Sequence, residues 1–293
     1  MNSKQQPGDE CRRQTGKGGT GMDRADHIDR TFVIPAFNEA RRLPGTLAAI
    51  SDFAAMHPGN CEVIVADDGS TDSTVEVALE FHSLRHCLRV LRLPHRGKGF
   101  AVRRGVSVAA GDVVILCDAD LHDGLLQAAR LEQAIVRGAD VAIGSRWVDH
   151  LECLTTQPLY RRVSSRIFNA VAGHILALPF RDTQCGLKAL TREAAGRIFP
   201  RIRMDGWAYD LELIHIALSL GLRVREVGVR LMHDYRESRF RPVTDGWAAC
   251  RELFEIRWND LRGAYPREAL STVSVMDRAM SAPLPEEIKE DAA

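Results

Sequence analysis

Residues Val113 to Asp123 read V-V-I-L-C-D-A-D-L-H-D, and this stretch decides the fold class. Its apolar first half is rich in β-branched residues and follows a Gly-Asp turn, a pattern that predicts a strand buried in a parallel sheet. The strand runs into Asp118-Ala119-Asp120, and α/β folds bind their ligands beyond the carboxyl ends of such strands. Two carboxylates at that edge suit Mg²⁺ or Mn²⁺ held jointly with a substrate diphosphate.

The same alternation of strand and helix extends to both sides of this stretch. The predicted strands are Phe32–Pro35, Glu62–Ala66, Leu88–Leu93, Val113–Cys117 and Asp140–Gly144, with helices between them at about 43–56, 72–86, 97–109 and 123–137. Short apolar strands separated by helices indicate βαβ units. The predicted fold class is therefore α/β, with a mainly parallel, Rossmann-like sheet flanked by helices.

Beyond Trp147 the rhythm changes. We expect a helix near 158–178, a strand at 184–190, a helix at 206–220, a strand at Leu222–Met232 and an amphipathic helix at about 244–262. The predicted organisation is a disordered polar tail over residues 1–29, one domain over 30–240, a C-terminal amphipathic helix within 241–265 and a polar tail over 266–293.

Bulk composition excludes several classes of protein. The chain has 293 residues with 39 Lys plus Arg and 39 Asp plus Glu, so no excess of basic charge points to nucleic acid. No run approaches the roughly 18 apolar residues of a transmembrane helix. The seven cysteines form no C-x-x-C pair, which is typical of reduced thiols. These features predict a cytoplasmic enzyme or binding protein.

Polar motifs follow four successive predicted strands. They are Pro35 with Asn38 and Glu39, then Asp67-Asp68-Gly69, then Lys98 in a glycine loop, and finally Asp118-Ala119-Asp120. Pro35 is expected to turn the chain out of the first strand. Carboxylates can accept hydrogen bonds from a nucleobase and a ribose, and glycine permits close backbone approach. A cation at the start of a helix can meet phosphate. Each motif alone is common, but four in order predict a nucleotide-sugar site.

At these residues the chain resembles the family 2 glycosyltransferases of the GT-A fold, over roughly Thr31 to Arg262. Later motifs narrow the resemblance: Gly144-Ser145-Arg146, D-T-Q-C-G-L-K at Asp182–Lys188 and W-A-Y-D-L-E-L at Trp207–Leu213 look like the dolichyl-phosphate β-glucosyltransferase branch. The resemblance implies an inverting enzyme that moves glucose from UDP-glucose to a polyprenyl phosphate. Eukaryotic members of that branch carry an N-terminal membrane anchor, which we do not expect here.

The resemblance also implies roles for individual residues. Asp118 and Asp120 would hold Mg²⁺ or Mn²⁺, and Asp210 matches the position of the general base in members with hydroxyl acceptors. The UDP-sugar would contact Pro35, Asn38, Glu39, Asp67, Asp68, Gly69, Lys98, Asp118 and Ala119, and the acceptor would contact Arg146, Arg161, Arg162, Asp182 and Gln184. A phosphate acceptor is already largely ionised at neutral pH, so it needs no base.

Three alternatives remain open at this stage. The acceptor could be a soluble hydroxyl compound, such as a precursor of cell wall or secondary metabolites. A nucleotidyl transferase has a similar sheet, but it usually carries G-x-G-T-R after the first strand, where this chain has P-A-F-N-E. A non-catalytic nucleotide-binding protein would have no use for Asp118, Asp120 and Asp210 together.

The last predicted helix carries an apolar stripe. Its members are Trp247, Cys250, Phe254, Trp258 and Leu261, and Arg251, Arg257 and Arg262 flank them. The commoner fate of such a stripe is to pack on the protein core, which we take as the first interpretation. The second is that the helix lies on an anionic membrane surface, which would make the protein peripheral at the inner face of the cell membrane.

Overall fold

The computed structural model describes residues 27–84, 86–148, 159–230 and 244–265, with the side chains of α5 described from Phe168 and those of α8 from Ala248. The strands are β1 (Arg30–Ala36), β2 (Cys61–Asp67), β3 (Leu88–Arg92), β4 (Val113–Leu116), β5 (Val141–Ser145), β6 (Lys188–Thr191) and β7 (Val224–Gly228). The helices are α1 (Leu43–Met56), α2 (Thr74–Leu79), α3 (Lys98–Val106), α4 (Ala128–Val136), α5 (Leu159–Leu176), α6 (Arg192–Ile198), α7 (Tyr209–Ser219) and α8 (Thr244–Leu261). Short 3₁₀ helices are η1 (His82–Leu84), η2 (His122–Gln127) and η3 (Phe199–Arg201).

The strands form one sheet in the order β3-β2-β1-β4-β6-β5-β7. Neighbours pair in parallel except at β6, which runs antiparallel between β4 and β5. The predicted α/β class with a mainly parallel sheet is thus confirmed. Because β6 reverses and β5 reverses again, the carboxyl ends of β1, β2, β4 and β5 meet at the same edge of the sheet.

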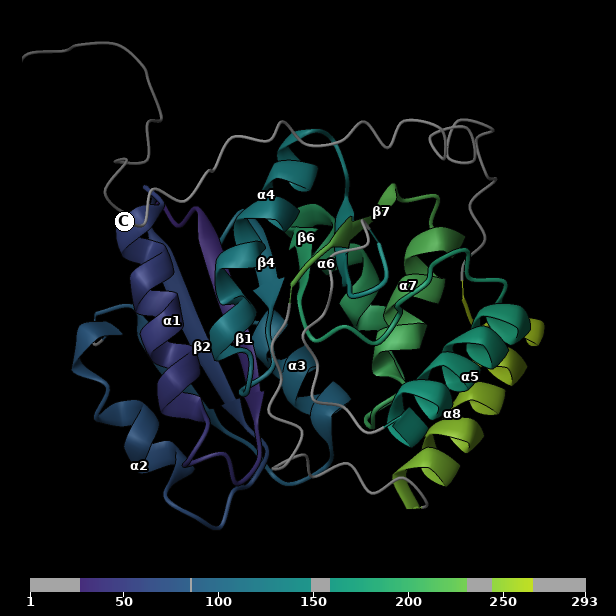
Figure 1. Ribbon diagram of the computed structural model, residues 1–293, viewed down its shortest axis with the longest axis horizontal. Helices are drawn as coiled ribbons and strands as arrows, with labels where there is room; N and C mark the ends of the chain where they lie inside the picture. Colours follow the sequence, from purple (N-terminus) through teal and green to yellow (C-terminus); the bar gives the residue numbers. More distant parts are fainter. Residues whose placement is uncertain (1–26, 85, 149–158, 231–243, 266–293) are drawn as a thin grey trace, which may run out of the picture.

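Successive side chains of a strand point to opposite faces of the sheet, and each face packs against its own hydrophobic core. Phe32 and Ile34 of β1 pack with α1 and α4, whereas Val33 packs with α3, α6 and α7. Helices α5 and α8 lie side by side at the far end of the molecule, beyond α7 (Figure 1). The sheet edge that gathers the polar motifs therefore rests on buried apolar packing from both faces.

Several predicted boundaries require correction. Pro35 does not turn the chain out of the first strand, because it pairs with Ala66 inside β1. The predicted strand at 184–190 begins only at Lys188, since the residues before it form a loop. That loop is fixed by side chains, with Thr183 Oγ1 donating to Asn169 Oδ1 at 2.7 Å. The predicted helix at 72–86 is α2 followed by η1.

Helix α6 was not predicted. It starts directly after β6, where Thr191 Oγ1 accepts a hydrogen bond from the Ala194 backbone N–H at 3.1 Å. The polar tail predicted for 1–29 falls outside the described residues up to residue 26. The backbone N–H of Asp29, in contrast, donates to the Asn60 carbonyl at 3.0 Å. The tail predicted for 266–293 lies outside the described residues.

Helix α8 packs with the face opposite to the predicted one. Leu253 and Ile256 are buried in the core, whereas Phe254, Trp258 and Leu261 are 62%, 54% and 61% exposed. The first interpretation of the stripe, packing on the core, is therefore wrong for these three residues. No helix in the described part of the chain has both the length and the apolar character needed to cross a bilayer.

Candidate active site

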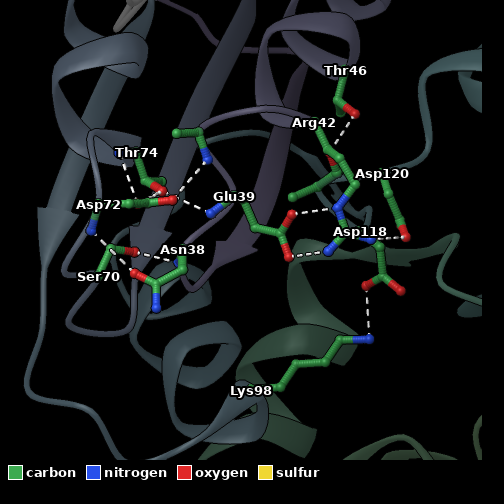
Figure 2. A network of polar contacts seen from close by, with 12 residues as sticks. Asn38, Glu39, Arg42, Thr46, Ser70, Asp72, Thr74, Lys98, Asp118 and Asp120 are labelled. Carbon is green, nitrogen blue, oxygen red and sulfur yellow. Dashed lines mark hydrogen bonds and ion pairs between the residues drawn. The ribbon is translucent and has the colours of Figure 1, made fainter. Parts of the chain in front are cut away.

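The two carboxylates of the D-A-D motif lie just past β4, and each forms an ion pair with a basic side chain from another element (Figure 2). Lys98 Nζ lies 2.7 Å from Asp118 Oδ1, and Arg42 donates to Asp120 Oδ2 at 3.0 Å. The Asp118 and Asp120 side chains are 27% and 31% exposed. The motif therefore presents charge at a partly open edge, balanced by two cations.

Arg42 is a site residue that the sequence analysis missed. Its guanidinium donates to both carboxylate oxygens of Glu39, with Nε to Oε2 at 2.6 Å, while it reaches Asp120 from the other side. Glu39 thus fixes the guanidinium of Arg42 (Figure 2). The i, i+3 spacing of Glu39 and Arg42 was a signal for their own ion pair and not for the contact between Arg42 and Asp120.

Lys98 is the first residue of α3, and close packing fixes its position. A Cβ on Gly99 would lie 2.5 Å from the Met204 carbonyl oxygen, so only glycine lets α3 begin here. The Lys98 ammonium also lies 5.3 Å from the centre of the Trp207 ring. Burial alone would lower the pKa of Lys98, but the carboxylates, first Asp118 and then Asp210, outweigh it and raise that pKa. Lys98 is therefore a firmly charged cation beside the motif.

Asp210 stands behind Lys98 and is almost enclosed. It belongs to the first turn of α7, and its side chain is 5% exposed. Its Oδ1 accepts a hydrogen bond from Lys188 Nζ at 2.6 Å, and its Oδ2 lies 3.9 Å from Lys98 Nζ. Asp210 thus lies near the D-A-D motif, with Lys98 between it and Asp118 and with Lys188 on its other side.

The D-D-G motif after β2 mainly organises the loop that leads into α3. Asp68 accepts hydrogen bonds from the backbone N–H groups of Arg96 and Gly97, both at 2.9 Å, and from the His95 ring at 2.7 Å. A Cβ on Gly69, whose φ is +77°, would lie 2.9 Å from the His95 backbone nitrogen. The close approach predicted at Gly69 is therefore to the protein's own loop.

Asn38 ties the loops after β1 and β2 together. Its backbone N–H donates to Ser70 Oγ at 2.8 Å (Figure 2). Its Oδ1 accepts from the Thr71 N–H at 2.7 Å. Asp67 caps the same turn, because its carboxylate accepts from the Ser70 N–H at 3.2 Å. Together with Asp68 these hydrogen-bonded residues form a rim at the same edge of the sheet as the D-A-D motif.

Ala119 contributes its backbone to the site. The carbonyl of this residue accepts a hydrogen bond from Thr46 Oγ1 at 2.8 Å, which ties the D-A-D turn to helix α1 (Figure 2). On the other side of the motif, a Cβ on Gly186 would lie 2.4 Å from Asp118 Oδ2. The turn is thus held between α1 and the D-T-Q-C-G loop.

Among the residues expected to contact the acceptor, Arg146 and Asp182 bind each other. Arg146 donates from Nε and a terminal nitrogen to the two Asp182 oxygens at 2.7 and 2.9 Å, and Asp182 is fully buried. Gln184 is half-buried on the same loop. Arg161 and Arg162 belong to α5, but their side chains lie outside the described residues.

The donor set fits a hard divalent cation. Mg²⁺ and Mn²⁺ are commonly bound by one or two carboxylates together with substrate phosphates, and Asp118 and Asp120 offer that pair at a partly exposed edge. Within the described ranges no group of three or more His, Cys, Asp and Glu residues could hold a metal ion. Phosphate oxygens of a substrate could add ligands to the two carboxylates.

Comparison with known proteins shows the family of this chain. The sequence model described as Glycosyl transferase family 2 matches residues 31–199. A dolichyl-phosphate beta-glucosyltransferase of Drosophila melanogaster is 34% identical over 261 residues, 83% of this chain and 79% of the relative. The chain belongs to glycosyltransferase family 2. The human protein of the same name is 30% identical to this family 2 enzyme over 252 residues, 81% of this chain and 78% of the relative.

Solved structures support the fold of this family 2 enzyme. Glucosyl-3-phosphoglycerate synthase from Mycobacterium tuberculosis, in complex with Mn²⁺, UDP-glucose and phosphoglyceric acid, superposes with a TM-score of 0.59 at 21% identity. The match covers 84% of this chain and 82% of that structure, so the likeness extends over most of the fold. The predicted family and a GT-A-like α/β architecture are confirmed, and the chain is a glycosyltransferase related to dolichyl-phosphate β-glucosyltransferases.

Proposed function

We propose that this enzyme transfers glucose, with inversion at the anomeric carbon, from UDP-glucose to a polyprenyl phosphate. The observation that carries the proposal is the meeting of Asp118, Asp120 and Lys98 at the carboxyl edge of the sheet. The donor and acceptor classes follow from relatives named dolichyl-phosphate β-glucosyltransferase. Mn²⁺ and UDP-glucose bound to the similarly folded synthase agree with the same donor.

The charges of the residues near the D-A-D motif suggest how they would bind the donor. Asp118 and Asp120 would hold Mg²⁺ or Mn²⁺, which supplies positive charge to the departing diphosphate. Lys98 would bind a diphosphate oxygen as a second cation. The rim formed by Asn38, Asp67 and Asp68 would border the uridine. Because Asp68 is committed to the loop before α3, we assign it to shaping that border.

The reaction itself needs no proton transfer. A phosphate oxygen of the acceptor forms the new bond to the anomeric carbon, and the bond from that carbon to the UDP oxygen breaks. UDP leaves with the bonding electron pair. We assign acceptor binding to the predicted set Arg146, Arg161, Arg162, Asp182 and Gln184, in which the pair of Arg146 and Asp182 would hold the loop in place.

A donor and acceptor panel tests the function. Purified protein is incubated with Mn²⁺ and each of several nucleotide sugars, with and without a short-chain polyprenyl phosphate. We expect lipid-extractable hexose only with UDP-glucose and the lipid phosphate. Transfer to a soluble hydroxyl acceptor, with none to the lipid, would replace the proposal by the alternative of a soluble acceptor.

The acceptor's lipid tail leads us to propose that the enzyme, cytoplasmic otherwise, binds a membrane surface through α8. Phe254, Trp258 and Leu261 lie at i, i+4 and i+7 and are all exposed. Arg251 flanks the stripe, and Arg262 lies 4.5 Å from the centre of the Trp258 ring. Exposed aromatic residues with arginines beside them suit a headgroup region of anionic lipids.

Co-sedimentation with liposomes tests this surface. We expect salt-sensitive binding to anionic vesicles, weaker binding to neutral ones, and loss of binding in a Phe254→Ser/Trp258→Ser variant. Leu79→Ser is the matched control, because Leu79 is 59% exposed on α2, at the other end of the molecule (Figure 1). Absence of binding at low salt, or equal binding by the α8 variant, would refute the assignment. If the wild type is a dimer and the α8 variant is a monomer, the exposed stripe is instead an interface with a second copy of the chain.

A further inference from the structure

Lys188 is an unusual residue for its place in the fold. It opens β6 in the interior of the sheet, opposite Leu116 of β4 and Ile143 of β5, and it is 1% exposed. Its ammonium donates to the Cys185 carbonyl at 2.7 Å and to Asp210 Oδ1 at 2.6 Å. A buried ammonium is costly unless it is paired, so this lysine needs the charge of Asp210.

The pair continues outward to the D-A-D motif as a row of alternating charges. Asp210 lies between Lys188 and Lys98, and Lys98 in turn contacts Asp118. Burial together with the Asp210 charge raises the pKa of the neighbouring Tyr209, which is therefore a neutral group. The charged groups facing Asp210 are two cations, Lys188 of β6 and Lys98 of α3.

This environment does not suit a general base. A base must accept a proton from the acceptor, yet both Asp210 oxygens face lysines and the side chain is 5% exposed. Protonating Asp210 during each turnover would leave Lys188 buried without its counter-charge. The same geometry suits a fixed anion that holds Lys98 toward the D-A-D edge.

We propose that Asp210 is a positioning residue, the shared counter-ion of Lys188 and Lys98, and that it takes no proton in the reaction. Lys98 is then held where it can bind the diphosphate of the donor. The acceptor must bring an oxygen that is already ionised, as a phosphate monoester does. This last consequence rests on the acceptor proposed above, whereas the positioning of Lys98 concerns the donor alone.

The test uses variants that leave neither charge of the buried pair of Asp210 and Lys188 without a partner. Asp210→Asn alone would leave Lys188 unpaired and could fail to fold, so the main variant is Asp210→Asn/Lys188→Met, which removes both charges together. Lys98→Gln and the triple variant complete the set. Arg192→Gln is the control, because this arginine forms its ion pair with Asp112, a residue that precedes β4 at the opposite edge of the sheet. Circular dichroism confirms folding of each variant.

The first readout is UDP affinity in saturating Mn²⁺, measured by calorimetry without any acceptor. We expect the double variant and Lys98→Gln each to weaken UDP binding about tenfold, the effect of one charge-assisted hydrogen bond. The triple variant should lose no more UDP affinity than the double variant or Lys98→Gln does. Arg192→Gln should bind UDP as tightly as the wild type. Unchanged UDP affinity in the double variant would overturn the proposal, even if no transfer to polyprenyl phosphate is ever detected.

The second readout is the pH dependence of transfer to polyprenyl phosphate. If Asp210 is a counter-ion, the acid limb of kcat/KM belongs to the acceptor phosphate, whose second pKa is about 6, and the double variant keeps it. The loss should then appear chiefly in the KM for UDP-glucose. If Asp210 is a base, the acid limb disappears and kcat falls by about 10²–10⁴ with the donor KM unchanged, which would also overturn the proposal.

Discussion

Single charged residues at the sheet edge differ in how much they matter to stability. Asp182 is fully enclosed, and the Arg146 guanidinium and backbone N–H are its nearest donors. Burial would raise the pKa of Asp182, but the charge and hydrogen bonds of Arg146 outweigh it and hold the pKa below its ordinary 3.8. Asp140 with Arg223 forms a similar but exposed pair.

Breaking the buried pair should therefore be costly. Arg146→Gln leaves a buried carboxylate without its cation and should lower the free energy of unfolding by about 3–5 kcal/mol. Arg223→Gln breaks the exposed pair and should cost about 0–1 kcal/mol. Urea unfolding measures both. Equal, small effects would show that the Asp182 pair adds nothing to the stability of the fold.

The lowered pKa of Asp182 predicts the direction of acid sensitivity. A carboxyl with a lower pKa in the folded state contributes its full stability above its ordinary 3.8 and loses it as the pH falls through the folded value. Thermal melts at a series of pH values below 5 should show a steeper loss of Tm for the wild type than for Asp182→Asn. Parallel curves for the two proteins would contradict this contribution.

Asp120 should matter to catalysis and not to folding. It is partly exposed, and its isosteric change to Asn keeps the hydrogen bond from Arg42 while removing a negative ligand. Asp120→Asn should abolish transfer with an unchanged melting temperature, and EDTA should do the same to the wild type. Full turnover by the variant, or by the wild type in chelator without added metal, would refute the metal assignment.

The sequence predicts a site residue when the pattern that marks it lies in the residues next to it along the chain. Asp118, Asp120 and Lys98 directly follow strand-forming or glycine-rich segments, so their meeting at one edge was predictable. Arg42 reaches Asp120 across 78 positions of the chain, and Lys188 reaches Asp210 across 22. Such pairings leave no periodic trace, so Arg42 beside Asp120 and Lys188 beside Asp210 were missed.

At the scale of elements, the site depends on how closely α3 approaches the segment before α7. Gly99→Ala would place a methyl group 2.5 Å from the Met204 carbonyl and 2.7 Å from Tyr209 Cβ. The helix must then shift, which should cost about 1–3 kcal/mol of stability and weaken UDP binding through the displacement of Lys98. Thermal melts and calorimetry measure both effects.

Gly196 in α6 is the matched control for that substitution. No atom lies within 4 Å of its added Cβ, so Gly196→Ala should raise stability by about 0.5–1 kcal/mol, as expected for a helix interior, and leave UDP affinity unchanged. If Gly99→Ala behaved like Gly196→Ala, close packing would not be what positions Lys98.

Elements were predictable where their periodicity is strong. β1, β2, β4 and β5 are buried apolar runs, and all were found within a few residues. The direction of β6 was not predictable, because an antiparallel strand between two parallel neighbours has the same apolar pattern. In α8 the aromatic stripe was visible in the sequence, but the smaller stripe with Leu253 and Ile256 is the one that packs on the core.

At the scale of the whole molecule, one region would bind the donor and another would bind the membrane. The carboxyl edge of β1, β2 and β4 gathers the D-A-D motif, its two cations and the rim for the donor. Helices α5 and α8 form the far end, where the exposed stripe of α8 would meet the membrane that holds the acceptor (Figure 1). A donor that arrives from solution and an acceptor that arrives from lipid would then meet on one enzyme.

The most direct test of the central claim compares two acceptors that share one tail. The wild-type enzyme is given UDP-glucose and Mn²⁺ with either a short-chain polyprenyl phosphate or the polyprenol of the same length, and UDP release and glycolipid are measured together. The account predicts glucosyl transfer to the phosphate and none to the alcohol, because Asp210 supplies no base. Transfer to the polyprenol at a comparable rate would contradict it.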